Sequence, residues 1–412
     1  MNIGFIGLGK LGLPVALAIE SKGYNVLGYD VNPNVAQYIS ERSIPFTEKD
    51  LQPLLDNTKI EIVEMEKLVN WADVLFCAVQ TPHDPKFEGS TRLPTERKDF
   101  DYQYLKSAVT HIAKEAAKQS KRIKLVVIST CLPGTFNREI KPLLNEFVDY
   151  VYNPLFIAMG TVLDDFLHPE FVLLGSEEPL KNDSIKWLYE SITDAPFVET
   201  DITSAEAVKV SYNTFITMKT VLGNAWGELC YKLGADFEAL YKAWGLSTRR
   251  LISTKYLKSG VGDGGGCHPR DNIAISYIAG KVDISHNIWE DLMLAREDHM
   301  AWIASIAYRE AQHNGFPIII LGRSFKPETN IETGSPAILL ENIFKDTYNY
   351  QPLHPGEIEV HEKPITKAVY VIGTQHDRYK QFSFPVGSVV IDPFRYIPNQ
   401  KDVQIISIGA KM

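Results

Sequence analysis

Short runs of apolar residues alternate with amphipathic stretches through residues 1–200. Helices that follow and precede short strands in this way build a parallel sheet with helices on both faces. We therefore predict a doubly wound α/β domain here, with Lys86–Arg97 as a polar surface loop. The expected strands are Ile3–Ile6, Asn25–Tyr29, Val74–Ala78, Leu125–Ser129 and Phe171–Leu174, and the clearest expected helices are Leu13–Lys22 and Tyr104–Ser120.

The strand pattern fades over residues 201–314, and the apolar positions there recur at three- and four-residue spacing. This spacing predicts a helical middle domain, with helices over Ala205–Leu233 and Asn287–Gln312 and a glycine-rich interruption at Ser259–Gly266. Strand-like runs then return, which predicts a second, smaller α/β domain over residues 315–412. Those runs are Pro317–Leu321, Val369–Ile372, Val389–Ile391 and Val403–Ser407.

The composition is that of a globular protein, because 45% of the 412 residues are hydrophobic and 23% are charged. A net charge of -9 argues against nucleic acids and anionic membranes as partners. The N-terminus runs directly into a strand, and no apolar stretch is long enough to span a bilayer. The four cysteines form no CxxC pair and predict neither a disulfide framework nor a metal site. We expect a soluble, cytoplasmic protein.

A glycine fingerprint, Gly7-Leu8-Gly9-Lys10-Leu11-Gly12, stands between the first expected strand and helix. Gly7 permits the tight turn, Gly9 lets the backbone approach a pyrophosphate, and Gly12 lets helix and strand pack closely. Asp30 closes the next strand, where its carboxylate can accept hydrogen bonds from both ribose hydroxyls and would repel a 2′-phosphate. A glycine turn without a ligand is the alternative, but this placement favours an NAD site.

Cys267 follows three glycines and precedes His268 and Pro269, and proline suits the first turn of a helix. A thiol at a helix N-terminus has a lowered pKa and is more nucleophilic. Asp271, four residues later, would share a helix face with Cys267. Cys267 could instead be a small buried hydrophobe, but its glycine and polar neighbours favour a reactive centre.

Lys209 and Asn213 lie four residues apart in the helical middle section. On one helix face, an ammonium and an amide could together hold a developing alkoxide. A solvated helix face with a chance Lys/Asn pair is the alternative, but the apolar and small neighbours favour a cleft.

Three further segments end strands, where open α/β sheets bind ligands. Lys326 follows the first strand of the last domain, although it could be an ordinary loop lysine. Ser129–Thr135 brings hydroxyls and a turn, and Asp392 with Arg395 offers a fork for phosphate.

These motifs, in this order, resemble the UDP-glucose/GDP-mannose dehydrogenase family of four-electron nucleotide-sugar dehydrogenases over nearly the whole chain. Gly7–Gly12 with Asp30 and Asn32 resembles the coenzyme site. The other matching segments are Val79-Gln80-Thr81-Pro82, Ser129-Thr130-Cys131-Leu132-Pro133-Gly134-Thr135, Tyr152-Asn153-Pro154, Lys209 with Asn213, Gly265-Gly266-Cys267 with Asp271, Phe325-Lys326-Pro327, and Asp392 with Arg395.

The resemblance implies two Rossmann-like doubly wound domains joined by a helical middle domain whose long helix also forms a homodimer. It implies NAD in the first domain and the diphosphate of a nucleotide sugar, most simply UDP-glucose, in the last. Cys267 would capture an aldehyde as a thiohemiacetal and later hold a thioester. Lys209 and Asn213 would stabilise oxyanions, while Asp271 and Thr130 would position water or relay protons.

The same resemblance distributes the binding residues. The coenzyme would meet Gly7, Gly9, Lys10, Leu11, Gly12, Asp30, Asn32, Thr81 and Thr130. The sugar nucleotide would meet Asn153, Leu155, Phe156, Lys209, Asn213, Tyr256, Lys258, Gly264, Lys326 and Arg395.

Several positions depart from the family pattern. Leu155 and Met159 stand where the family usually has glutamates, and leucine carries no group that can accept a proton. Arg270 replaces a lysine, and Thr333-Gly334-Ser335-Pro336 departs from R-E-S-P, which removes an arginine expected at the diphosphate.

Two alternatives remain open. A two-electron β-hydroxyacid-type dehydrogenase would use the Lys209 helix but would leave the Cys267 motif and the last domain unexplained. A nucleotide-sugar-binding protein with impaired turnover would explain the missing acids.

Overall fold

The computed structural model describes the chain except for residues 83–94, 97, 179–181, 254–255, 257, 262–266, 328, 330, 357–365 and 410–412, and at residues 267 and 274 it describes the backbone. The chain divides into two compact units, Met1–Met218 and Lys219–Met412. The division falls within one continuous helix, α8 (Ile202–Leu233). The expected three-domain division at residues 200 and 314 stays a prediction.

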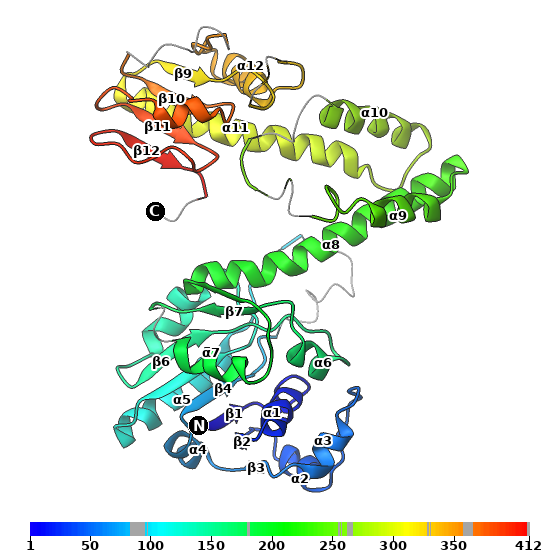
Figure 1. Ribbon diagram of the computed structural model, residues 1–412, viewed down its shortest axis with the longest axis vertical. Coiled ribbons are helices and arrows are strands. Elements are labelled where there is room, and N and C mark those ends of the chain that lie inside the picture. Colours follow the sequence, from blue (N-terminus) through cyan, green and yellow to red (C-terminus); the bar gives the residue numbers. More distant parts are fainter. Residues whose placement is uncertain are drawn as a thin grey trace. The chain divides into compact units, whose positions relative to one another are not determined.

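The described part of the first unit contains an eight-stranded sheet in the order β3-β2-β1-β4-β5-β6-β7-β8 (Figure 1). The six strands from β3 to β6 in this order are parallel. Because β1 pairs with β2 on one side and β4 on the other, the winding reverses at its carboxyl end, where such sheets bind ligands. The strands are β1 (Asn2–Ile6), β2 (Asn25–Tyr29), β3 (Glu61–Ile62), β4 (Val74–Cys77), β5 (Ile123–Val127), β6 (Val148–Tyr152), β7 (Val172–Gly175) and β8 (Phe197–Thr200).

The last two strands depart from the expected all-parallel sheet. β7 joins β6 in antiparallel direction through Tyr152 and Gly175, and β8 is parallel to β7. Asn153 fastens this junction, because its side-chain Nδ2 donates to the carbonyl of Leu173 at 2.9 Å. The antiparallel direction of this edge belongs to the tertiary pairing of β6 and β7, which strand periodicity does not report.

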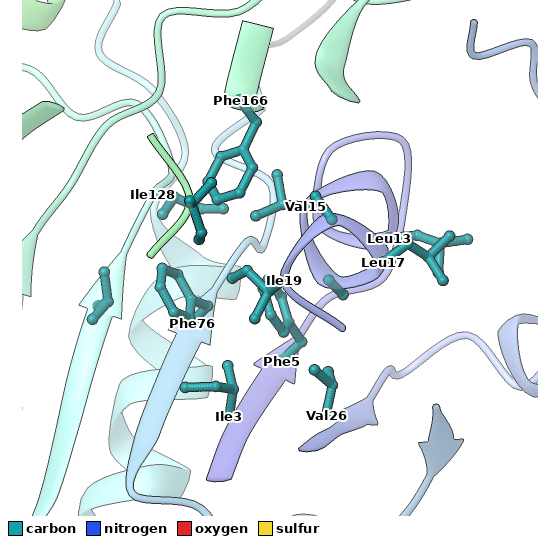
Figure 2. Packing of buried hydrophobic residues seen from close by; sticks show 14 of the residues in the cluster. Ile3, Phe5, Leu13, Val15, Leu17, Ile19, Val26, Phe76, Ile128 and Phe166 are labelled. Atoms are coloured by element: carbon teal, nitrogen blue, oxygen red, sulfur yellow. The ribbon is translucent and has the colours of Figure 1, made fainter. Parts of the chain in front are cut away.

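Both faces of the sheet are buried, because successive strand side chains point to opposite sides. Ile3 and Phe5 join one apolar cluster, whereas Ile6 joins the other. Phe5 and Phe76 stack within the first cluster, with ring centroids 5.1 Å apart (Figure 2). That face is covered by α1 (Gly12–Ser21), α2 (Asn34–Ser40), α3 (Gln52–Asn57), α6 (Val162–Leu167) and α7 (Asp183–Glu190), and the other by α4 (Met65–Trp71), α5 (Gln103–Gln119) and the π-helix η2 (Phe136–Ile140), which the short η3 (Lys141–Leu143) follows.

The second unit begins with helices and ends with a small sheet. The rings of Trp226 on α8 and Trp289 on α11 meet edge to face at 5.3 Å, beside Ala279 of α10. Four parallel strands follow in the order β12-β11-β10-β9. The elements are α9 (Phe237–Leu246), α10 (Cys267–Lys281), α11 (Ile288–Asn314), β9 (Ile318–Leu321), α12 (Pro336–Tyr348), β10 (Val369–Ile372), η6 (Asp377–Gln381), β11 (Val389–Asp392) and β12 (Gln404–Ser407).

The α/β fold class is confirmed, and every strand expected from the hydrophobic pattern is present with its ends shifted by at most two residues. The pattern did not predict β3, β6 and β8. The small sheet is also covered on both faces, by α11 and α12 on one side and by η6 and its neighbours on the other. Among the described residues, none of the helices combines the length and the apolar character needed to cross a bilayer.

Candidate active site

The turn between β1 and α1 requires its glycines. Gly7 has φ +87°, a left-handed conformation that strains other residues. A Cβ on Gly12 would lie 1.9 Å from the carbonyl oxygen of Gly7, so only glycine fits there. A Cβ on Gly9 would meet nothing within 4 Å, so the backbone faces open space at that point. α1 has no acidic residue in its first turn and no side-chain cap, which leaves its N-terminus suited to an anion.

Asp30 joins this turn to the end of β2. Its Oδ2 accepts the N–H of Leu8 at 2.7 Å, and its Oδ1 accepts the N–H of Asn32 at 2.8 Å. The carboxylate is half-buried and keeps lone pairs for further donors. Lys10 and Asn32 are exposed, and Leu11 is half-buried. The structure thus places the predicted coenzyme residues of β1, α1 and β2 at one edge of the sheet.

Thr81 and Thr130 lie beyond the ends of β4 and β5, and the structure brings them together. The hydroxyl of Thr81 donates to the carbonyl of Thr130 at 2.9 Å. The hydroxyl of Ser129 donates back to the carbonyl of Val79 at 2.6 Å. Both loops are therefore joined at the carboxyl edge of the sheet, and Thr130 is half-buried there.

Lys209 on α8 reaches the loop that follows β6. Lys209 is only 7% exposed. Its Nζ donates to the carbonyl of Leu155 at 2.7 Å and lies 5.0 Å from the ring centroid of Phe156. Burial lowers the pKa of the Lys209 ammonium. A carbonyl and a ring leave its charge unneutralised, which is the arrangement that an oxyanion can exploit.

Asn213 lies one helical turn beyond Lys209 and is exposed. The intervening Tyr212 packs edge-on against Phe156, with ring centroids 4.8 Å apart, and donates its hydroxyl to Glu170 at 3.1 Å. Lys209 and Phe156 are therefore in contact, whereas the Asn213 side chain lies on the open part of the same helix.

Asn153 is positioned differently from an exposed ligand-binding residue. It is 1% exposed, and both its polar atoms are engaged within the unit. Its Nδ2 donates to Leu173, and its Oδ1 accepts the hydroxyl of Tyr189 at 2.6 Å. In this conformation Asn153 holds the β6–β7 junction, so its expected contact with a sugar stays a prediction.

In the second unit, Cys267 is the first residue of α10, and Pro269 lies in the first turn as expected. Asp271 shares this helix, and its Oδ1 is paired with Arg270 through Nε at 2.9 Å and Nη2 at 2.8 Å. Tyr256 meets the ring of His268 edge-on at 5.9 Å and is 66% exposed. The predicted substrate residue Gly264 lies outside the described residues.

Arg395 holds the first residue of the glycine-rich stretch at Ser259–Gly266. Its guanidinium donates to the carbonyls of Pro393 at 3.0 Å, Ile408 at 2.7 Å and Ser259 at 2.6 Å. Gly260 is held from a second side, where its carbonyl lies 3.1 Å from Nε2 of His299. Three carbonyl partners give Arg395 a structural role, and its expected contact with phosphate stays a prediction.

Other candidates of the second unit also have protein partners. Asp392 is fully buried and accepts three backbone N–H groups, from residues 394, 396 and 397. Arg323, at the end of β9, pairs with Glu332 and with Glu341, each at 3.1 Å. Lys326 is exposed, with Nζ 5.4 Å from the ring centroid of Phe325, and Lys258 is exposed as well.

A pocket of about 640 Å³ lies elsewhere, near the start of β2. Trp71, Lys59 and Glu61 are among its lining residues, and no predicted site residue is. Within the described residues, no group of three or more His, Cys, Asp or Glu side chains is arranged to hold a metal ion.

Family models match two successive parts of the chain. Residues 1–193 match the NAD binding domain of the UDP-glucose/GDP-mannose dehydrogenase family, and residues 203–295 match the family's central domain. The chain belongs to this family. Its first unit carries the NAD site, and the protein is a member of a family of nucleotide-sugar dehydrogenases.

The chain is similar to relatives named for UDP-glucose and to relatives named for GDP-mannose. The UDP-glucose 6-dehydrogenase of Bacillus subtilis is 28% identical over 352 residues, which cover 82% of this chain and 76% of the relative. The GDP-mannose 6-dehydrogenase of Pseudomonas aeruginosa is 26% identical over 388 residues, covering 89% and 86%. The crystal structure of a ternary complex of GDP-mannose dehydrogenase from Pseudomonas aeruginosa has the same fold, with a TM-score of 0.84, 22% identity and coverage of 98% and 100%.

The glycine turn fits the NAD that this family binds. Gly7 and Gly12 allow the close turn, Gly9 leaves the backbone open to a pyrophosphate, and Asp30 offers carboxylate oxygens at the end of β2. When bound, NAD supplies a hydride acceptor. The resemblance seen in the sequence, the fold and the cofactor are all confirmed.

The two positions where the family usually has glutamates have different surroundings. Leu155 packs against the apolar cluster under α1, and Met159 is 66% exposed. The carboxylates near this loop bind its backbone: Asp165 accepts the N–H of Ala158 at 2.8 Å, and Glu48 accepts that of Gly160 at 3.1 Å. They therefore hold the loop in place.

Glu206, on α8, was missed by the sequence analysis. It is 0% exposed, and its carboxylate holds the loop that contains Thr130. A signal was present: an acid three residues before Lys209, between Ala205 and Val208, interrupts the buried face of a helix. Such an acid needs a partner, but periodicity could not say which one.

Proposed function

We propose that the protein is an NAD-dependent nucleotide-sugar 6-dehydrogenase that oxidises UDP-glucose at C6 to the uronic acid in a four-electron reaction. The observation that carries the oxidation step of this proposal is the buried Lys209 ammonium at the carboxyl edge of the NAD-binding sheet, donating to the Leu155 carbonyl at 2.7 Å. No carboxylate in the described part of the chain pairs with this ammonium, which therefore suits a developing negative charge on the sugar oxygen.

The chain's own residues divide the work. Lys209 and Asn213 stabilise the oxyanion of each oxidation step. The thiolate of Cys267 adds to the aldehyde carbon, and the thiohemiacetal keeps the sugar bound between the two hydride losses. The second hydride loss leaves a thioester, and water then attacks the acyl carbon and releases the uronic acid and the thiol. Asp271 and Thr130 position that water or relay its proton.

The departures at residues 155 and 159 concern the hydrolytic step. Leu155 cannot accept a proton, and the nearby Asp165 and Glu48 accept backbone N–H groups of this loop. In this proposal, Asp271 and Thr130 therefore position the attacking water or relay its proton. Slow hydrolysis, with accumulation of the thioester, is the expected consequence.

The remaining contacts follow the same proposal. Asn153, Leu155, Phe156, Tyr256, Lys258, Gly264, Lys326 and Arg395 contact the sugar nucleotide, whose diphosphate binds the last of three domains. The protein works as a cytoplasmic homodimer. Exposed apolar residues on α8 support a partner surface there, among them Phe215, Ile216, Met218 and Val221.

Two other functions are compatible with some of the same observations. A two-electron dehydrogenase is supported by the Lys209 helix beside an NAD-binding sheet. A nucleotide-sugar-binding protein with impaired turnover is supported by Leu155 and Met159. GDP-mannose is the competing substrate, because relatives of both names are similarly close.

A substrate panel tests these alternatives. The purified protein is incubated with NAD and UDP- or GDP-linked sugars, while NADH absorbance and product mass are followed. Two NADH per UDP-glucose and a uronic acid product are expected. One NADH per sugar favours the two-electron reaction. Binding of a sugar nucleotide without NADH formation favours a binding protein with impaired turnover. Turnover of GDP-mannose alone shows that GDP-mannose, not UDP-glucose, is the substrate.

Cys267→Ser is expected to lower net oxidation by at least about a thousandfold, because a serine hydroxyl is a much weaker nucleophile towards the aldehyde carbon than a thiolate. Affinity for NAD, measured by fluorescence titration, should hardly change. Asp30→Ala is the matched comparison, since it should weaken NAD binding while leaving the acyl chemistry intact. Unchanged turnover in Cys267→Ser would remove the thiol from the mechanism.

A further inference from the structure

The loop at residues 130–136 is held by its backbone from several sides. The hydroxyl of Tyr152 accepts the N–H of Cys131 at 3.0 Å, and the hydroxyl of Tyr102 accepts the N–H of Leu132 at 3.2 Å. Thr81 donates to the carbonyl of Thr130. All these contacts use main-chain atoms of the loop, so the side chain of Thr130 takes no part in them.

Glu206 makes the strongest of these attachments. Its Oε2 accepts the N–H of Gly134 at 2.6 Å, and its Oε1 accepts the N–H of Phe136 at 2.8 Å. Hydrogen bonds to an ionised carboxylate are shorter and about twice as strong as neutral ones. Gly134 has φ +86°, which turns the chain so that both N–H groups face one carboxylate.

A fully buried carboxylate is costly unless it is well bonded. Burial raises the pKa of Glu206, and the N–H groups of Phe136 and Gly134 and the charge of Arg138 offset this in part. A neutral amide of the same shape could bind only one of the two N–H groups. The carboxylate is therefore suited to holding both ends of this turn.

Glu206 and Lys209 lie three residues apart on α8, so they share one helix face. Lys209 donates to the loop after β6, and Glu206 holds the loop after β5. One helical turn thus fixes both loops relative to each other. A small displacement of either loop changes the distance between the Thr130 hydroxyl and the Lys209 ammonium.

We propose that Glu206 is a positioning residue for catalysis, which fixes Thr130 against the turn of α8 that carries Lys209. This inference rests on the proposed function, because it assigns Thr130 and Lys209 to the reaction. Glu206 itself touches neither sugar nor coenzyme in this proposal. It acts through the geometry of the loop at residues 130–136.

Glu206→Gln tests the proposal, with Glu115→Gln as the matched control. Glu115 is a buried acid on α5 of the same unit, 8% exposed. We expect Glu206→Gln to lower kcat at least about tenfold, since misplacement by about 1 Å can cost a hundredfold. The KM for the sugar nucleotide should change much less, and Glu115→Gln should leave kcat nearly unchanged.

A double-mutant cycle separates positioning from a purely structural role. If Glu206 acts through Thr130, Glu206→Gln should lower kcat little further in a Thr130→Ala background. Additive losses, or an unchanged kcat in Glu206→Gln, would overturn the proposal. Should Glu206→Gln fail to fold, Glu206→Asp replaces it, because the shorter side chain can reach at most one of the two N–H groups.

Hydrogen exchange keeps this test independent of the proposed activity. The amides of Gly134 and Phe136 should lose protection in Glu206→Gln and keep it in Glu115→Gln. Retained protection in Glu206→Gln would refute the positioning role even if the enzyme is active. Absence of wild-type turnover with every sugar nucleotide would refute the proposed function, while the exchange result still decides whether Glu206 holds the loop.

Discussion

Two buried glutamates, one in each unit, show how partners decide what a buried charge does. Glu206 is 0% exposed and Glu341 is 8% exposed. Glu206 is bonded to two backbone N–H groups. Glu341 is surrounded by side chains, with Lys345 at 2.7 Å, His354 at 2.8 Å and Arg323 at 3.1 Å.

The pKa values of these two carboxyls move in opposite directions. Burial raises the pKa of Glu206, and backbone N–H groups only partly offset it. Burial also acts to raise the pKa of Glu341, but hydrogen bonds from Lys345, His354 and Gln351 lower it to about 2. Glu206 binds backbone N–H groups and so holds a loop. Glu341 binds charged side chains instead, and these cations are then less available to a ligand.

The cations show the same contrast. Lys209 donates to a carbonyl and keeps its charge unneutralised, whereas Arg323 is paired with Glu332 and Glu341. The first unit therefore contains a buried cation that no carboxylate of the described residues is seen to pair with. In the second unit, Arg323 is engaged in ion pairs within the protein. Nearby, Thr333 stands where the family pattern predicts an arginine.

The largest effect is expected from Lys209→Met, which removes the unneutralised cation. Loss of one preorganised donor to an oxyanion typically costs about a hundredfold to a thousandfold in kcat. Burial lowers the pKa of Lys209. The kcat of the wild type should therefore fall at a lower alkaline pH than the titration of an ordinary lysine would give, and this fall should be absent in Lys209→Met.

Lys186→Met is the control, since Lys186 is a more exposed lysine of the same unit, paired with Glu199 at 2.8 Å. It should leave kcat unchanged. A Lys209→Met enzyme that retains most of its kcat would show that the buried ammonium only supports the loop after β6.

An intermediate effect is expected from acid on the Glu341 network. The folded pKa lies near 2 and the ordinary value is 4.5, so the stabilisation is complete above 4.5 and is lost as the pH falls towards 2. The loss amounts to about 3 kcal/mol. The free energy of unfolding in urea, monitored by hydrogen exchange of the α12 amides, should become the same for the wild type and Glu341→Gln as the pH falls through this range.

Asp377→Asn is the comparison in the same unit, because Asp377 is exposed and is paired with Lys380 at 2.8 Å. Its unfolding should differ little from that of the wild type at every pH. A Glu341→Gln difference that stays constant from pH 7 to acid would show that packing, not charge, stabilises this network.

The smallest effect is expected from Arg270→Lys, which restores the family's usual cation. Arg270 and Asp271 are 70% and 67% exposed, and exposed pairs contribute about 0–1 kcal/mol. Thermal unfolding and kcat should therefore hardly change. A large loss of kcat would instead show that Asp271 depends on the planar guanidinium for its orientation.

Much of the first unit was predictable because its signals are local. Strand runs, helical spacing and the Gly7–Gly12 turn each follow from neighbouring residues, and Asp30 follows from its place at the end of β2. The antiparallel direction of β7 could not be predicted, because strand direction depends on how distant segments pair and not on the local hydrophobic pattern. The partners of Glu206 and Arg395 were hidden for the same reason.

The sequence alone determined the two α/β regions and the NAD turn, since periodicity and backbone conformation are properties of short segments. It also named candidate residues for the chemistry, which stay predictions. The tertiary structure decided which of the charged residues are engaged. It buried Lys209 beside a carbonyl, gave Arg395 three carbonyl partners and enclosed Glu206 behind the Thr130 loop. Burial and distant hydrogen bonds arise only when segments far apart in the chain pack together.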